Sequence, residues 1–310
     1  MPFTFPIPKL GLGAAPLGSP TPDSTFGEVS EAAAIATVQR CLEQGVTFFD
    51  TAPLYGAGLS ESRLGMALQG VPRSQYQIAT KIGFLAQEDG SVVRDYSRDA
   101  VLRSIEASFA RLQIDYAEIV HIHDLDHHLT EALDHAFPPL LELKEQGVIG
   151  AIGSGVNTWQ PLVHLARHAP FDCFLLAGRY TLLEQEPLAE LFPLCSEKGI
   201  RIILGGVFNT GILAAGARSG AHYQYGAPPQ EIIEKTLRIE AVCERHGVPL
   251  KAAALQFAIA HPVVATLAVG MKKPSEVDEN VAAFQTPIPP AFWQELRSLS
   301  LIDPTAPLPQ

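Results

Sequence analysis

Short apolar runs alternate with amphipathic stretches along most of this chain. The runs are nearly continuous in apolar residues, which is typical of parallel strands covered on both faces. The stretches between them repeat apolar residues at helical spacing, as Val101, Ile105 and Phe109 do. Eight runs are predicted to be strands, namely residues 10–15, 48–51, 77–82, 118–123, 149–153, 173–177, 201–204 and 266–269.

Three junctions between a predicted helix and the next strand share a glycine followed by Val or Ile. Glycine takes the left-handed conformation that ends a helix at low cost. The three glycines are Gly45, Gly147 and Gly199. Eight βα units without a doubly wound break predict the α/β class and one (β/α)8 TIM barrel over residues 1–310. Residues 4–7 are expected to cap the barrel bottom, and the Pro-rich tail, 287–310, to wrap its outside or rim.

The composition of the chain limits the classes of binding partner and the location to be expected. The net charge of −11 argues against nucleic acid or an anionic membrane surface, since both select a basic face. The four cysteines are far apart in apolar segments and predict buried free thiols. No stretch reaches the roughly 18 apolar residues of a membrane span, and the N-terminus lacks the pattern of a signal peptide. The expected location is cytoplasmic.

Three successive predicted strands end in an ionisable residue. These are Asp50, Lys81 and His123, and Tyr55 lies in the loop after the first of them. In a parallel α/β barrel, the C-terminal ends of the strands carry the chemistry. These residue types predict acid–base catalysis at a substrate oxygen. The phenol would move the proton and the ammonium would lower the pKa of the phenol, while the carboxylate would hold the ammonium and the imidazole would orient the substrate.

His121 and His123 also raise a metal alternative. Residues two apart on a strand share a face, and a His-x-His pair could ligate zinc. The later predicted strands end without His or Asp, so no metal is expected. His127 and His128 are expected to be solvated. The loops after the seventh and eighth strands, beginning at 209 and 270, are predicted to bind phosphate groups.

Several motifs resemble the aldo-keto reductase superfamily. Residues 48–56 and 60–65 resemble its first signature, and residues 79–81 and 120–124 resemble its lysine and histidine motifs. Two further stretches resemble its fifth-strand motif and its C-terminal cofactor motif, namely residues 147–153 and 274–280. The similarity runs in order from about residue 10 to 285.

The resemblance implies a nicotinamide enzyme in which Tyr55 exchanges the proton, with Asp50, Lys81 and His123 as its partners. It implies that Asn157 binds the carboxamide with Ser154 nearby. The pyrophosphate is then assigned to Thr210, Gly211 and Leu213, the adenosine half to Gly270, Lys272, Glu276 and Asn280, and further cofactor contacts to Gly206 and Phe208.

Three residues depart from the pattern of the superfamily. Ala177 stands where many members have a Gln that binds the cofactor carboxamide, and Gly205 stands where many members have an aromatic residue stacked on the nicotinamide. Glu276 stands where NADP-preferring members carry Arg, and a carboxylate there would repel a 2′-phosphate. NAD is therefore the expected cofactor, while Lys272 leaves use of NADP open.

Residues 175–183 and 205–213 resemble the bacterial sugar 1-dehydrogenase branch, which includes L-fucose and D-threo-aldose 1-dehydrogenases and pyridoxal 4-dehydrogenase. This similarity implies oxidation of an aldose at C1 to the lactone. Three alternatives stay open: a pyridoxal 4-dehydrogenase, a general aldehyde or ketone reductase, and a cofactor-sensing regulatory subunit with little turnover. The substrate, a small sugar or aldehyde, is expected to meet loops 84–95, 124–129 and 218–229. The oligomeric state is not indicated.

Overall fold

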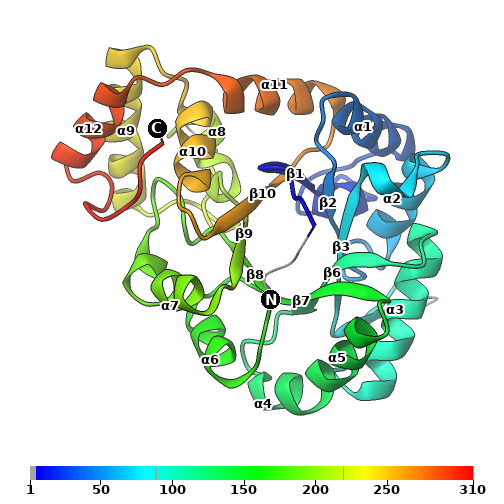
Figure 1. Ribbon diagram of the computed structural model, residues 1–310. Coiled ribbons are helices and arrows are strands. Elements are labelled where there is room, and N and C mark those ends of the chain that lie inside the picture. The colour runs from blue at the N-terminus through cyan, green and yellow to red at the C-terminus, as the bar shows by residue number, and fades with distance from the viewer. Residues whose placement is uncertain (1–4, 88, 219, 310) are drawn as a thin grey trace.

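The computed structural model describes residues 5–87, 89–218 and 220–309. Eight parallel strands close into a barrel in the order β1-β10-β9-β8-β7-β6-β3-β2, and helices surround it (Figure 1). The barrel strands are β1 (Leu10–Gly13), β2 (Phe48–Asp50), β3 (Gln77–Ile82), β6 (Ala117–His123), β7 (Ile149–Val156), β8 (Cys173–Ala177), β9 (Arg201–Gly205) and β10 (Val264–Gly270). The (β/α)8 prediction is confirmed, and each predicted strand differs from the observed one by at most three residues at either end.

The helices follow the predicted amphipathic stretches. The longer ones are α1 (Glu31–Glu43), α2 (Leu59–Leu68), α3 (Arg98–Leu112), α5 (Phe137–Glu145), α6 (Gln160–His168), α7 (Leu191–Lys198), α9 (Gln230–His246), α10 (Leu250–Ile259), α11 (Pro274–Gln285) and α12 (Pro290–Ser298). Short turns are η1 (Ala15–Gly18), η2 (Arg73–Gln75), α4 (Leu129–Glu131), η3 (Ala132–Ala136), η4 (Glu186–Ala189), η5 (Asn209–Gly211) and α8 (Ile212–Ala215). Serine hydroxyls cap α1 and α3, because Ser30 accepts from the Ala33 N–H and Ser97 from the Ala100 N–H.

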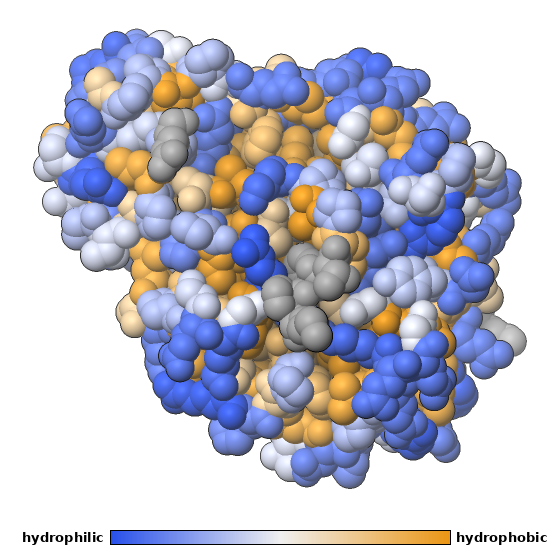
Figure 2. All heavy atoms as spheres, viewed as in Figure 1, coloured by the Kyte–Doolittle hydropathy of each residue, from blue (hydrophilic) through white to orange (hydrophobic). Residues whose placement is uncertain are grey.

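The barrel has an inner and an outer apolar layer. Alternate strand residues point inward, and the inner cluster comprises Phe48, Ala79, Ile119, Ala151, Cys173, Leu175, Ile203 and Ala268. Phe5 and Ile7 pack against this cluster, and Figure 1 shows the N-terminal segment crossing the middle of the strand ring. The predicted cap of the barrel bottom is thus present from residue 5 onward, and Thr4 lies outside the described residues. Figure 2 shows apolar residues between the helices and polar residues around the outer rim.

The C-terminal tail packs on the outside of the barrel, as expected. It includes a helix that was not predicted from the sequence. This helix, α12, buries Phe292 and Trp293 and lies beside α9 (Figure 1). All four cysteines are buried free thiols, as predicted.

One predicted loop is wrong in part. Within residues 84–95, strands β4 (Phe84–Ala86) and β5 (Val92–Arg94) form an antiparallel hairpin that pairs Phe84 with Arg94. Across the part of the chain described, no helix has both the length and the apolar character that a membrane crossing requires.

Candidate active site

Asp50, Lys81 and His123 meet at one end of the barrel, because β2, β3 and β6 are consecutive neighbours in the ring. Lys81 is almost fully buried, at 1% exposure. Its Nζ donates to Asp50 Oδ2 and to the Thr51 carbonyl, at 2.7 Å each. An ammonium buried with a carboxylate and a second acceptor is fixed in position and kept charged.

The loop that carries Tyr55 is fixed by close backbone packing. A Cβ on Gly56 would lie 2.1 Å from the Gly18 carbonyl oxygen, so only glycine fits where this loop crosses η1. The Tyr55 ring centroid lies 4.8 Å from Lys81 Nζ, and the His123 ring packs edge-on at 5.8 Å. All four sequence-predicted residues are therefore adjacent.

Burial dominates the electrostatics of the phenol. It raises the pKa of Tyr55 to about 12, while the Lys81 ammonium lowers it and the Asp50 carboxylate raises it further. Lys81 lowers this pKa, as expected, but desolvation disfavours the phenolate more than one ammonium favours it, so the net shift is upward. The net pKa of Tyr55 in this structure therefore lies above its ordinary value.

His123 and His121 are both neutral and buried. Burial, followed by the Lys81 charge, holds the pKa of each well below the ordinary value. Among the described residues, His123 Nδ1 and both ring nitrogens of His121 have no hydrogen-bond partner. Tyr96 anchors the end of β6, since its hydroxyl donates to the His123 carbonyl at 2.6 Å. Tyr96 was not predicted, and nothing in its local sequence distinguishes it.

The loop after β9 has a strained backbone. Asn209 and Thr210 have φ of 45° and 62°, and Gly211 follows at 111°. A β-branched residue at positive φ is an outlier, and such strain gathers at functional sites. Asn209 holds the loop, because it accepts from the Thr181 hydroxyl at 2.6 Å and donates to the Gly178 carbonyl at 3.1 Å.

Other residues predicted for this loop surround the strained turn. Gly206 also has positive φ, at 59°. Leu213 is fully buried, and Phe208 packs partly buried against the core. The Tyr225 N–H donates to Thr210 Oγ1 at 3.2 Å, so the 218–229 segment reaches the same loop.

The residues predicted for the adenosine half gather after β10. Gly270 ends this strand, and the Lys272 N–H donates to Glu276 Oε2 at 2.9 Å. Lys272 Nζ donates to the Phe26 carbonyl at 3.1 Å. Asn280 is 3% exposed, and its Oδ1 has no partner among the described residues. An unpaired buried acceptor on α11 fits a site that receives a polar ligand.

Ser154, Asn157 and His128 each make contacts that the sequence did not indicate. The Ser154 hydroxyl is buried and donates to the Ile122 carbonyl at 3.1 Å. Asn157 is exposed, and its carbonyl accepts from Arg179 Nε at 2.7 Å. Their cofactor contacts stay predictions. His128 is not simply solvated, because its ring packs on Tyr96 and bonds Glu131 at 2.9 Å, whereas His127 is exposed as expected.

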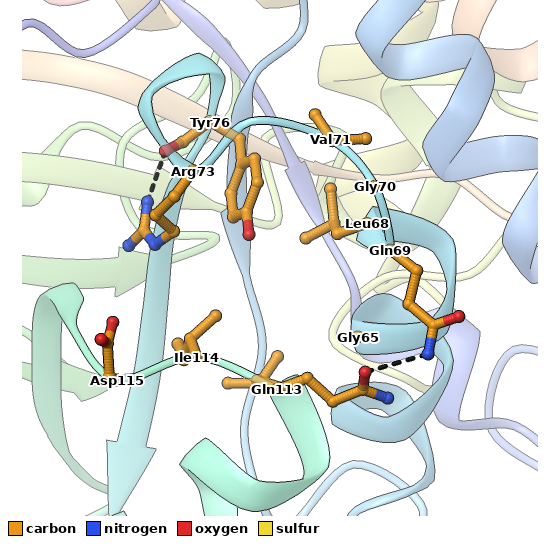
Figure 3. Close-up of a pocket in the computed structure, with 11 residues that line it drawn as sticks. Gly65, Leu68, Gln69, Gly70, Val71, Arg73, Tyr76, Gln113, Ile114 and Asp115 are labelled. Carbon is orange, nitrogen blue, oxygen red and sulfur yellow. Dashed lines mark hydrogen bonds between the residues drawn. The ribbon is translucent and has the colours of Figure 1, made fainter.

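A cavity of about 560 Å³ lies at the opposite end of the barrel, where β3 and β6 begin. Figure 3 shows the Tyr76 ring and Leu68 on its walls and the Gln69–Gln113 hydrogen bond, 2.9 Å long, at its edge. This cavity contains none of the predicted site residues. No group of three or more metal-ligating side chains occurs within residues 5–87, 89–218 and 220–309.

Known proteins match this chain over nearly its whole length. The model of the Aldo/keto reductase family matches residues 9–301. A D-threo-aldose 1-dehydrogenase of Pseudomonas sp is 35% identical, covering 96% of this chain and 95% of the relative. A pyridoxal 4-dehydrogenase of Microbacterium luteolum is also 35% identical, with the same coverage. The holo structure of an aldo-keto reductase from Bacillus halodurans superposes with a TM-score of 0.80 at 25% identity, covering 96% of this chain and 95% of that one.

Proposed function

This chain belongs to the aldo/keto reductase family, and we propose that it oxidises an aldose of the L-fucose or D-threo type at C1 to the lactone, with NAD as acceptor. The family consists of NAD(P)-dependent oxidoreductases that act on small carbonyl compounds and alcohols. An aldose substrate is supported by the 35% identity to a D-threo-aldose 1-dehydrogenase over 96% of this chain.

One observation carries the proposal: the phenol of Tyr55 lies beside a buried ammonium and an imidazole at the barrel mouth. Tyr55 takes the proton of the anomeric hydroxyl during oxidation and returns it during reduction. Lys81 favours the phenolate at that moment, and Asp50 holds Lys81 in place. Neutral His123 hydrogen-bonds the same substrate oxygen and sets its orientation.

The residues after β9 and β10 fit a dinucleotide. A nicotinamide bound at the mouth supplies the hydride acceptor. Thr210 and Gly211 would offer a strained small-residue loop to the pyrophosphate, and the unpaired Asn280 Oδ1 could accept a hydrogen bond from the adenosine half. Glu276 supports a preference for NAD, because its carboxylate, which accepts from the Lys272 N–H, would repel a 2′-phosphate bound beside it.

Pyridoxal oxidation is the second candidate. It is favoured by the 35% identity to a pyridoxal 4-dehydrogenase over 96% of this chain. Pyridoxal, like an aldose, presents a cyclic hemiacetal, so the same proton path from the hemiacetal hydroxyl to Tyr55 serves both substrates.

A dehydrogenase assay tests the proposal. L-Fucose, D-arabinose, L-galactose and pyridoxal are each supplied with NAD and with NADP, and steady-state turnover is followed. We expect multiple turnovers of a sugar with NAD. Tyr55→Phe should lose about 10²–10⁴-fold in kcat, the typical contribution of acid–base catalysis, while its Kd for NAD stays near that of the parent.

Three outcomes would contradict parts of this proposal. Turnover of pyridoxal alone selects the second candidate. Tight NAD binding with no turnover of any substrate identifies a cofactor sensor. A lower Kd for NADP than for NAD rejects the role given to Glu276.

A further inference from the structure

Asp124 directly follows His123 at the mouth and has an unusual backbone. Its φ is +46°, in the left-handed region that non-glycine residues rarely occupy. The Asp124 N–H donates to the Gly155 carbonyl at 2.9 Å, and the Asp124 carbonyl accepts from the Tyr96 hydroxyl at 3.0 Å. The backbone is therefore held in this conformation from two sides, and the strain is maintained by surrounding structure.

This conformation brings the carboxylate back toward the catalytic imidazole. Asp124 Oδ1 lies 3.9 Å from His123 Nε2, beyond hydrogen-bond range. The side chain is 30% exposed, so a ligand at the mouth can reach it. Burial, followed by Asp126, raises the pKa of Asp124, whereas Lys81 and Arg94 lower it.

The neighbouring carboxylates accept hydrogen bonds from protein donors, and the carboxylate of Asp124 accepts none from the described residues. Asp95 accepts from the Ser97 N–H at 2.8 Å, and Asp126 accepts from the Thr158 hydroxyl. In the described parts of the chain, no donor hydrogen-bonds the Asp124 carboxylate. A partly buried carboxylate without a donor loses solvation free energy that a ligand hydroxyl would restore.

We propose that Asp124 makes this enzyme select substrates with a hydroxyl on the carbon next to the reacting carbon. The inference rests on the proposed function and narrows its substrate class. A substrate oxygen bonded to His123 Nε2 sits about 2.8 Å from that nitrogen. Oxygens on adjacent carbons lie about one hydrogen-bond length apart, so the second hydroxyl falls within reach of a carboxylate 3.9 Å from Nε2. An aldose carries this hydroxyl at C2, and a simple aldehyde does not.

The test compares L-fucose with 2-deoxy-L-fucose in the parent enzyme and in Asp124→Asn. Asn also tolerates positive φ, so this change removes charge and leaves the backbone conformation accessible. We expect the parent to prefer L-fucose in kcat/KM by about 10- to 100-fold, the contribution of a hydrogen bond to a charged group. Asp124→Asn should lose most of that preference. Asp124→Gly, which accepts the same φ and has no acceptor, should abolish it.

Asp115→Asn is the matched control, since it makes the same charge change in an exposed residue at the other end of the barrel. It should keep the parental preference. An unchanged fucose to 2-deoxyfucose ratio in Asp124→Asn and Asp124→Gly would overturn the inference.

Failure of the proposed function gives a different result. If the parent oxidises no sugar, the aldose proposal is rejected, and Asp124 is then tested by reduction of lactaldehyde and propanal with NADH. A preference for lactaldehyde that Asp124→Gly removes supports the inference. Equal rates on the two aldehydes, or no turnover of either, overturn it.

Discussion

Among single residues, Tyr55 shows most directly how burial and charge compete. Burial raises the pKa of its phenol to about 12, and the Lys81 ammonium is the largest opposing influence. With Tyr55 as the proposed proton carrier, oxidation would need the phenolate, so its rate should increase with pH across the alkaline range. Reduction would need the phenol and should stay level there. Lys81→Met removes the opposing charge and should shift the alkaline rise of oxidation to higher pH, as measured by kcat profiles in both directions.

A second variant separates this effect from damage to the fold. Lys81→Met alone leaves Asp50 buried without its cation, which costs about 3–5 kcal/mol of unfolding free energy. The double variant Asp50→Asn/Lys81→Met removes both charges and should recover most of that loss in urea unfolding. Its pH shift should be smaller but still upward, since Lys81 affects Tyr55 more than Asp50 does. A parental pH profile in both variants would show that Lys81 does not tune the phenol.

The residue types of the site were predictable, but their environment was not. Asp50 and His123 end their strands and Lys81 is one residue from the end of its own, and strand ends can be located from apolar runs. The net pKa shift of Tyr55 depends on how its ring is enclosed against Lys81 and His123. The position of its loop depends on the close contact between Gly18 and Gly56, 38 positions apart in the sequence, and no local pattern reports that contact.

Among the secondary-structure elements, α2 carries the second part of the first family signature, residues 60–65, which lies beyond Tyr55. Glu61 is fully buried and accepts from the Thr80 hydroxyl at 2.6 Å and from Arg111 Nε at 2.8 Å. Arg63 donates to the Leu17 carbonyl at 2.6 Å. The helix thus ties β3, α3 and η1 together behind the loop that carries Tyr55, and these residues contribute packing rather than chemistry.

Gly65 makes the packing of α2 on α3 testable. A Cβ at this position would lie 2.4 Å from the Arg111 carbonyl oxygen and 2.9 Å from the Leu112 carbonyl carbon, both backbone atoms. Gly65→Ala should lower the unfolding free energy by about 1–3 kcal/mol in urea titrations, although Ala favours a helix by about 1 kcal/mol. Gly226→Ala is the control, because its Cβ would meet no atom closer than 3.9 Å. Equal stability of the two variants would contradict tight α2–α3 packing.

Two elements missed from the sequence carried local signals. The β4–β5 hairpin contains Asp89-Gly90, and an Asp-Gly pair between apolar runs favours a hairpin turn. The tail helix α12 begins at Pro290, and proline is common in the first turn of a helix. In both places a polar or proline-rich composition suggested a loop. In α12, the burial of Phe292, Trp293 and Leu296 favours the helix.

For the molecule as a whole, closing the barrel forces every inward side chain to share one narrow interior. His121 is an example: a Cβ on Gly153 would lie 2.2 Å from its Nδ1, so the glycine on the neighbouring strand makes room for the imidazole. The barrel itself could be predicted from the eight βα units in the sequence. The fit between Gly153 and His121 could not be predicted, because it depends on strand register across the closed sheet.

Buried neutral histidines make the whole fold sensitive to acid. Burial, with the Lys81 charge, holds the pKa of His121 and His123 well below the ordinary value, and burial lowers the pKa of His261 to about 4. In the unfolded chain these groups titrate near 6.5. Below that pH the unfolded chain binds more protons than the folded one, so stability falls as pH decreases, by up to about 1.4 kcal/mol per pH unit for each histidine.

The contribution of one histidine can be isolated by comparing variants. Urea unfolding of the parent and of His121→Gln between pH 7.5 and 5 should give slopes that differ by up to about 1.4 kcal/mol per pH unit, with the variant less sensitive to acid. Buried carboxylates such as Glu184, whose pKa burial raises, oppose the histidines but are the same in both chains and cancel in the difference. His222→Gln, at an exposed site, should retain the parental slope. If His121→Gln also retained it, His121 could not be a neutral imidazole enclosed by the barrel, and the inner layer beneath Lys81 would have to be open to water.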